Sequence, residues 1–267
     1  MIITDKFVYI HLPKTGGSFV NSALLQAHGI RWNLWQQATL TFSGRLVHHG
    51  DLGSIQMRDK HGSCQRIPPA HQHKPILSTI RNPLDYYVSD YEFGWWKRRE
   101  WRRYYQKLPH FKARYPDFPQ LTFGDYLHLM TEAFNPPGQQ DFDDPLQLGF
   151  CSASFIKMFA RNPAEIFAVE NLSSNSLATI QNGLYPVHFL TTQGLNQHLY
   201  EYLQNLGYPP ENIRFILEKD RVLPLGKGRE ASQKWEQYYD NSAIELIRQK
   251  DQLFFELLPS FDSKMCQ

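Results

Sequence analysis

The stretch His11-Leu12-Pro13-Lys14-Thr15-Gly16-Gly17-Ser18-Phe19 decides how the chain begins to fold. It overlaps a short apolar run at residues 7–12, whose composition is typical of a β-strand. It leads into SFVNSALLQAHG, residues 18–29, which has the apolar spacing of a helix and ends at a glycine. The sequence therefore predicts a strand, a glycine-containing loop and a helix, in that order.

This loop has the residue types of an anion site. In an open parallel sheet, ligands bind at the carboxyl ends of strands, and a helix N-terminus there presents free backbone N–H groups. Gly16 and Gly17 have no Cβ, so the backbone can approach an anion closely. Lys14 adds a positive charge, and Thr15 and Ser18 add hydroxyl donors. The loop predicts a site for a phosphate or sulfate group.

The rest of the chain has the pattern of an α/β protein. Further strands are expected at residues 45–49, 75–80 and 166–169, and helices at 84–106, 122–133 and 235–258, the last broken near Asp240. Short apolar runs followed by polar turns and helices favour a parallel central sheet flanked by helices. A hydrophobic content of 42% suffices for a core, so we expect a single domain over residues 1–267.

A second anion motif follows the strand expected at 75–80. Arg81 stands at the end of that strand, and Pro83 suits the first turn of a helix, where its missing N–H is no loss. Ser89 lies about two turns further along that helix. Arg81 and Ser89 could converge on one anion, the arginine through a charge-assisted fork and the serine through its hydroxyl.

Together the two motifs resemble those of the sulfotransferases that use 3′-phosphoadenosine 5′-phosphosulfate (PAPS). The wording HLPKTGGSF looks most like the Golgi carbohydrate sulfotransferases, such as the heparan 2-O type, and their bacterial relatives. The resemblance implies a P-loop-like sulfotransferase fold in which residues 14–19 grip the 5′-phosphosulfate. It also implies that Arg81 and Ser89, eight positions apart, hold the 3′-phosphate. Lys227 and Arg229 resemble the late Lys-Gly loop that covers the 3′-phosphate in this family.

Transfer to a hydroxyl needs a general base, and histidine is the natural choice near neutral pH. His48-His49-Gly50-Asp51 follows the strand expected at 45–49, and we expect it on the same sheet edge as both anion loops. In the resembling enzymes this place reads His-Gly-His. Here Asp51 replaces the second histidine, so His49 is the first choice and Asp51 the second, as base or as partner to a histidine. His11 is a weaker choice, because strand alternation points it into the core.

The expected reaction is an in-line transfer of the sulfuryl group of PAPS to an acceptor hydroxyl, with a carbohydrate acceptor favoured by the resemblance. Lys14 and the loop N–H groups would stabilise charge on the transferring group and on the leaving phosphate. We expect no metal requirement, because no carboxylate, histidine or cysteine cluster has metal-ligand spacing.

Two other functions fit parts of the sequence. A P-loop-like small-molecule kinase would use ATP and Mg²⁺, but its motif places the lysine after the second glycine, whereas Lys14 precedes both glycines here. A non-catalytic glycan or nucleic-acid binder could use WWKRREWRRYY, residues 95–105, because sugars and bases stack on aromatic rings. The same stretch could also bind the acceptor of a sulfotransferase.

The composition of the chain limits which binding partners and which cellular location we expect for the protein. A formal net charge of +2 is too small to favour a bulk polyanion, so nucleic acid is not an expected partner. Three widely separated cysteines predict neither a disulfide framework nor a zinc site. The N-terminus lacks the pattern of a signal peptide, and no run approaches the ~20 apolar residues that span a bilayer. We therefore expect a cytoplasmic protein with no membrane span.

Overall fold

The structure, a computed structural model, describes residues 1–30, 44–99, 102, 105, 111–133, 144–220, 222 and 232–261. The chain divides into two compact units. Unit 1 comprises Met1–Arg81, Phe155–Pro163 and Asn182–Pro224, and unit 2 comprises Asn82–Ser154, Ala164–Gln181 and Leu225–Gln267. That all 267 residues form a single domain stays a prediction.

Unit 1 contains a six-stranded sheet with the strand order β3-β4-β1-β2-β5-β6. Its strands are β1 (Ile2–Thr4), β2 (Val8–Ile10), β3 (Leu46–Gly50), β4 (Gly53–Met57), β5 (Ile76–Ile80) and β6 (Val187–Thr191). The pairs β2–β5 and β5–β6 are parallel, whereas β1–β2, β1–β4 and β3–β4 are antiparallel. The predicted mixture of helices around a central sheet is confirmed, but the prediction of a parallel sheet is wrong for three of the five strand pairs in the described residues.

The difference arises from β1, a three-residue strand that precedes the first expected one. The chain reverses at Asp5 and Lys6, so β1 runs antiparallel to β2 and separates it from β4. The carboxylate of Asp5 accepts a hydrogen bond from the Ser54 backbone N–H at 2.7 Å, which ties this turn to the hairpin between β3 and β4. As a result, β4 runs in the same direction as β2, and β3 runs in the opposite direction.

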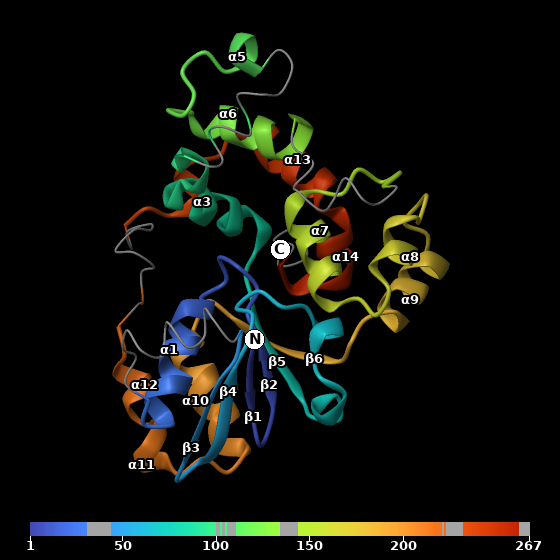
Figure 1. Cartoon of the computed structure of the whole chain (residues 1–267). Helices are drawn as coiled ribbons and strands as arrows, with labels where there is room; N and C mark the ends of the chain where they lie inside the picture. Colours follow the sequence, from blue (N-terminus) through green and yellow to red (C-terminus); the bar gives the residue numbers. More distant parts are fainter. Residues whose placement is uncertain are drawn as a thin grey trace. The chain divides into compact units, whose positions relative to one another are not determined.

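Helices pack on the sheet of unit 1. They are α1 (Gly17–Ala27), α10 (Leu195–Asn205), α11 (Pro210–Ile213) and α12 (Phe215–Glu218), with short 3-10 turns η1 (Cys64–Arg66) and η2 (Pro69–His71). These four helices lie together on one side of the sheet (Figure 1), where Leu24 and Leu199 are fully buried in one apolar core. Burying a side chain of this size contributes about 1.5–3 kcal/mol. On the other face, Phe159 packs against Phe189 with ring centroids 5.1 Å apart.

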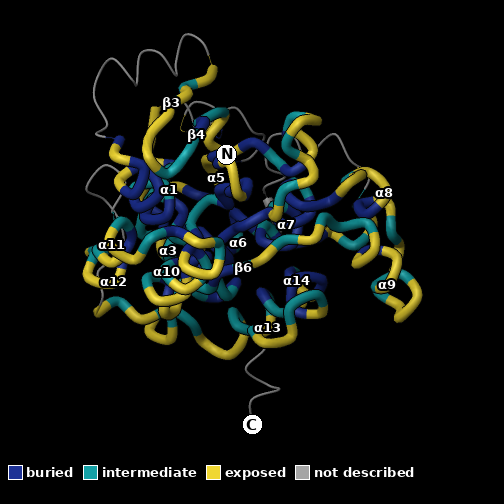
Figure 2. Tube along the Cα trace, turned by 90° about the horizontal axis from the view of Figure 1, so that it is seen from below, coloured by how far each residue is buried: buried dark blue, intermediate teal, exposed yellow. Residues whose placement is uncertain are grey.

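The strands predicted at 45–49 and 75–80 differ in burial. Every residue of β5 is buried, as expected for a strand covered on both faces. By contrast, β3 is an edge strand whose residues are half-buried or exposed, and Figure 2 shows it largely in the exposed colour. The strands predicted at 45–49 and 75–80 are therefore both present, but they occupy very different places in the sheet.

The other described elements are helical. They are α3 (Pro83–Phe93), η3 (Trp95–Lys97), α5 (Phe111–Arg114), α6 (Phe123–His128), η4 (Leu129–Ala133), α7 (Phe150–Phe159), α8 (Pro163–Phe167), α9 (Ser174–Asn182), η6 (Trp235–Gln237), α13 (Asn241–Lys250), α14 (Gln252–Leu257) and η7 (Pro259–Phe261). None of the helices in the described ranges is long and apolar enough to cross a membrane.

Local capping signals account for several helix ends. Asn82 caps α3 by accepting from the Leu84 N–H at 2.9 Å, and Gly94 in a left-handed conformation ends that helix, well before the expected residue 106. The predicted break at Asp240 is confirmed, because its carboxylate caps α13. The strand predicted at 166–169 is wrong. Ile166 and Phe167 instead form the end of α8, since a four-residue apolar run does not distinguish a strand from a short helix.

Candidate functional site

The loop that follows β2 has an unusual backbone. Lys14 has a φ of 64° and Gly16 a φ of 87°, both in the left-handed region. For a residue with a Cβ such as Lys14, this conformation is unfavourable by about 1–3 kcal/mol and is found most often at functional sites. Gly16 is the N-cap of α1, and its carbonyl accepts from the N–H of Phe19 at 2.9 Å. In the part of the chain that the structure describes, the N–H groups of Gly17 and Ser18 have no acceptor.

A chain of hydroxyl groups holds this loop against the sheet. The Thr15 hydroxyl lies 2.8 Å from the Leu12 carbonyl and 2.7 Å from the Thr79 hydroxyl, which in turn lies 3.2 Å from the hydroxyl of Tyr9. Each hydroxyl has a single hydrogen, so the bonds run in one direction, from Tyr9 to Thr79 to Thr15 to the carbonyl. Burial raises the pKa of Tyr9, which keeps this phenol protonated as the first donor.

This chain changes the role expected of Thr15. Its side chain is buried, and its only hydroxyl hydrogen is already donated to Leu12. The prediction that the Thr15 hydroxyl donates to a bound anion is therefore not supported. The residue instead anchors the loop to β2 and β5, which holds the loop backbone in place before any ligand arrives.

The second anion motif reaches the first through Arg81. Because β2 and β5 are parallel neighbours, the residues that follow them lie at the same edge of the sheet. The Arg81 guanidinium donates from Nη1 to the Lys14 carbonyl at 2.9 Å. The structure thus brings together the two basic residues that the sequence places about 70 positions apart.

The other residues expected to hold the nucleotide lie in different parts of the protein. Phe19 is only 6% exposed and packs in the core of unit 1, so its predicted contact with a ligand stays a prediction that its backbone would have to fulfil. Ser89 is half-buried on α3 in unit 2, and its convergence with Arg81 stays a prediction. Lys227 and Arg229 lie outside the described residues.

His49 and Asp51 lie at the wrong edge of the sheet for the predicted role. Because β3 runs opposite to β2, its last residues lie at the edge away from the glycine loop. A Cβ placed on Gly50 would lie 3.4 Å from the carbonyl of His28, which follows the C-terminus of α1. The 11-residue α1 spans roughly 16 Å. The expectation that these two residues share an edge with the anion loops is therefore wrong.

His11 lies beneath the loop instead. It follows β2 on the same face as Tyr9 and is only 4% exposed. The Asn21 side-chain amide donates to His11 Nδ1 at 3.1 Å, which leaves the ring proton on Nε2. A Cβ built on Gly17 would lie 2.4 to 2.8 Å from three atoms of this ring, so only glycine fits there. Burial, and to a smaller extent the charge of nearby His61, lowers the pKa of His11 to about 2.

His61 is the exposed histidine at the loop edge, and sequence reasoning missed it. It follows β4, whose direction brings residues 58–61 to the edge where β2 ends. Its ring centroid lies 5.0 Å from that of His11, and its Nδ1 lies 3.4 Å from the His11 carbonyl. With Nδ1–H donated to that carbonyl, Nε2 has a free lone pair. Partial desolvation, followed by the charge of Lys60, lowers the pKa of His61.

The sequence contains a motif that includes His61, but its place in the fold could not be predicted from the sequence. One His-Gly pair, at residues 61–62, comes shortly after β4, and another, at residues 49–50, ends β3. Which of the two pairs reaches the loop depends on strand direction, and this was hidden until β1 was known. Within the described ranges, no group of three histidine, cysteine, aspartate or glutamate residues could hold a metal ion.

Comparison with known proteins adds no relative. No protein-family model matches the chain, and no curated protein matches it either. The functional assignment therefore depends on the geometry of the loop edge, where Lys14, Arg81 and His61 come from three separate parts of the sequence.

Proposed function

We propose that this chain is a PAPS-dependent sulfotransferase with a P-loop-like sulfotransferase fold. The observation that carries the proposal is the 2.9 Å hydrogen bond from Arg81 to the Lys14 carbonyl, which joins two anion motifs at one sheet edge. A ligand with two separate anionic groups suits such a pair of motifs better than one with a single phosphate. PAPS has a 5′-phosphosulfate and a 3′-phosphate.

The glycine loop would take the 5′-phosphosulfate. The N–H groups of Gly17 and Ser18 stand at the start of α1, where the helix dipole also favours an anion. Lys14 would add a full positive charge beside them. The 3′-phosphate would go to Arg81, with Ser89, Lys227 and Arg229 as the further contacts that the family resemblance implies.

In the proposed step, the acceptor hydroxyl attacks sulfur while its proton passes to a base. The sulfur–oxygen bond to the 5′-phosphate breaks in line, and adenosine 3′,5′-bisphosphate leaves. Lys14 would stabilise the negative charge that develops on the bridging oxygen. No metal ion takes part in this scheme.

We assign the base to His61 in place of His49. His61 lies at the edge of the loop, and its Nε2 can accept a proton once Nδ1–H is donated to the His11 carbonyl. Its lowered pKa leaves it unprotonated, and therefore able to act as a base, at neutral pH. His11 is unsuited to this role because it is buried under Gly17, but its carbonyl fixes the tautomer of His61.

A binding test separates this proposal from a kinase. A ligand at 100 times its Kd stabilises the folded state by about 2.7 kcal/mol. For a chain of this size, that raises Tm by roughly 5–10 °C. We expect this shift with adenosine 3′,5′-bisphosphate in the absence of magnesium and none with ATP–Mg²⁺. A shift with ATP–Mg²⁺ alone would favour the kinase and refute the sulfotransferase.

A turnover test addresses Lys14. With labelled PAPS and a panel of saccharide acceptors, Lys14→Ala should lower kcat by roughly 100-fold or more, the usual loss when one charge-stabilising group is removed. Its Tm should stay close to that of the wild type. Lys112→Ala removes an exposed lysine of α5 and is the matched control. If Lys14→Ala turns over as fast as this control, Lys14 has no catalytic role.

A further inference from the structure

The turn between β6 and α10 reaches the glycine loop from the side of β5. Because β6 is the parallel neighbour of β5, with Ile80 opposite Thr191, the residues that follow both strands lie at the same edge of the sheet. The Thr192 N–H donates to the Ile80 carbonyl at 3.2 Å, so the pairing continues one residue beyond β6. Gly194 is then the N-cap of α10 and has a φ of 68°. The start of α10 therefore lies at the edge of the sheet that carries the glycine loop.

Leu195, the first residue of α10, packs directly on Gly16 of the loop. A Cβ built on Gly16 would lie only 2.7 Å from Cδ2 of Leu195 and 3.8 Å from Cγ2 of Thr192. The Leu195 methyl group therefore fills the space that a side chain at position 16 would need. Leu195 is only 8% exposed and belongs to the same apolar core as Val20 and Leu24 of α1. This contact joins the start of α10 to the residue that caps α1.

The first turn of α10 is itself held in place. The Asn196 side-chain amide donates to the carbonyls of Ile216, in α12, and Lys219, at the end of that helix, over 2.7 and 2.9 Å. One turn further along α10, Leu199 is fully buried in the core. Leu195 lies between these two supports, so its methyl group is held against the loop from behind.

The loop needs support because part of its backbone is unfavourable. The left-handed conformation of Lys14 persists only where the surrounding structure imposes it. The polar supports are the Thr15 hydroxyl and the Arg81 guanidinium, which donates to the Lys14 carbonyl. In the proposed function Arg81 also binds the 3′-phosphate, so the loop shares this support with the ligand. Leu195 is apolar, and its contact with Gly16 does not compete with a ligand for hydrogen bonds.

We propose that Leu195 is a positioning residue for the glycine loop. By filling the space beside Gly16, it holds the start of α1 and fixes the orientation in which Gly17 and Ser18 present their N–H groups to an anion. A loop that is fixed before the ligand arrives avoids a cost of ordering on binding. The inference rests on the proposed function, because the anion concerned is the 5′-phosphosulfate.

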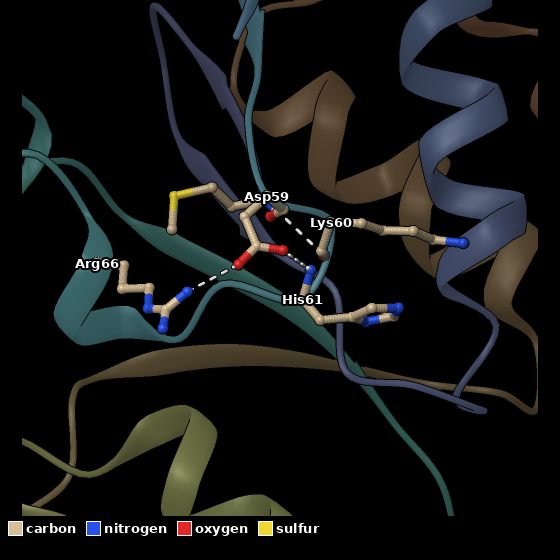
Figure 3. Close-up of polar contacts among 5 residues, drawn as sticks. Asp59, Lys60, His61 and Arg66 are labelled. Atoms are coloured by element: carbon tan, nitrogen blue, oxygen red, sulfur yellow. Dashed lines mark hydrogen bonds and ion pairs between the residues drawn. The ribbon is translucent and has the colours of Figure 1, made fainter. Parts of the chain in front are cut away.

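His61, at the other side of the loop, is held by contacts of its own. Figure 3 shows that the Asp59 carboxylate accepts from the His61 backbone N–H, at 3.1 Å, and from Arg66 Nη1, at 2.9 Å. Both bonds are made within residues 59–66, and neither involves α10. A change at Leu195 should therefore lower kcat without moving the pH at which kcat rises, because the surroundings of His61 stay the same.

Titration calorimetry with adenosine 3′,5′-bisphosphate on the full chain tests the proposal. Leu195→Ala removes the methyl groups beside Gly16 and should weaken binding by roughly tenfold or more, since small misplacements of binding groups have effects of this size. Leu199→Ala is the matched control. It empties a more deeply buried part of the same core, so it should lower Tm at least as much, yet keep an affinity within about threefold of the wild type. Leu195→Met keeps a long apolar side chain and should keep wild-type affinity within about threefold.

Hydrogen exchange of the free protein measures the loop without any ligand. The amides of Phe19 and Val20, which donate to the Gly16 carbonyl, should exchange roughly tenfold faster or more in Leu195→Ala than in the wild type. In Leu199→Ala their exchange should stay within about threefold of the wild type. If Leu195→Ala does not fold, Leu195→Val, which is shorter by one carbon, should show both losses at roughly threefold or more.

The proposal is overturned if the Leu195 variant matches the wild type in affinity or in exchange, if Leu199→Ala shows equal losses, or if the pH profile of kcat moves. The exchange measurement keeps the two proposals distinct. Faster exchange in the Leu195 variant of a protein that does not bind the bisphosphate would refute the sulfotransferase and leave a supported loop. Bisphosphate binding that is equal in wild type and variant would refute the role of Leu195 alone.

Discussion

Replacing Gly17 with alanine tests the packing beneath the glycine loop. A Cβ at this position would lie 2.4, 2.5 and 2.8 Å from the Cδ2, Nε2 and Cγ atoms of His11. The ring cannot easily move aside, because Asn21 bonds its Nδ1 and the ring of His61 packs against it. Overpacking of this kind destabilises a protein by about 1–3 kcal/mol.

The same substitution has an opposite effect on the helix itself. Gly17 is the first residue of α1 and does not have a positive φ, so alanine there should favour the helix by about 0.5–1 kcal/mol. In the wild type the clash outweighs this gain, and we expect a net destabilisation of roughly 1–2 kcal/mol. In a His11→Ala background the ring is gone and only the gain remains. Gly17→Ala should then become neutral or stabilising.

Thermal and urea unfolding of the four proteins in this double-mutant cycle would give the coupling energy between the two positions. Gly124→Ala in α6 is the matched control, because a Cβ there meets only the Thr122 hydroxyl at 3.9 Å. It should be mildly stabilising in both backgrounds. If Gly17→Ala destabilises the protein equally with and without the His11 ring, the ring does not lie where the structure places it.

Three further predictions concern charge and protonation. Arg81→Lys should weaken adenosine 3′,5′-bisphosphate binding by roughly 10- to 100-fold, because a charge-assisted bond of about 1.5–3 kcal/mol to the loop is lost; calorimetry showing unchanged affinity would contradict this. His61→Ala should lower kcat and abolish the increase of kcat that the wild type shows as the pH rises through the lowered pKa of His61. His49→Ala should leave this pH profile of kcat unchanged. The reverse result would restore His49 as the base. Burial raises the pKa of Asp251 to about 6, so ionisation of its carboxyl group favours the unfolded state. The wild type should therefore lose roughly 3 kcal/mol of folding stability from this group as the pH rises from about 4 to above 6. Unfolding curves of Asp251→Asn should lack this loss, and an equal pH dependence of stability in both proteins would refute the assignment.

The sequence could predict those structural features that depend on interactions between residues close together in the chain. The strand, loop and helix around residues 7–29 follow from apolar spacing and a glycine at each turn, and all three are present. The capping of helices by Asn82, Thr122 and Asp240 also depends on bonds within a few residues. A side-chain cap forms with its own helix, whatever the rest of the chain does.

Strand direction and the composition of the site depend on partners far along the chain, so only the folded protein decided them. Residues 45–49 and 53–57 have similar short apolar patterns, yet β1 lies beside β4 and sets which of the two points toward the loop. That choice places His61 near His11 and leaves His49 near the other end of α1. The Lys14 backbone carbonyl that accepts from Arg81 is likewise a partner that no side-chain pattern reveals. Periodicity records which face of a segment is buried, but it carries no information on which distant segment covers that face or in which direction it runs.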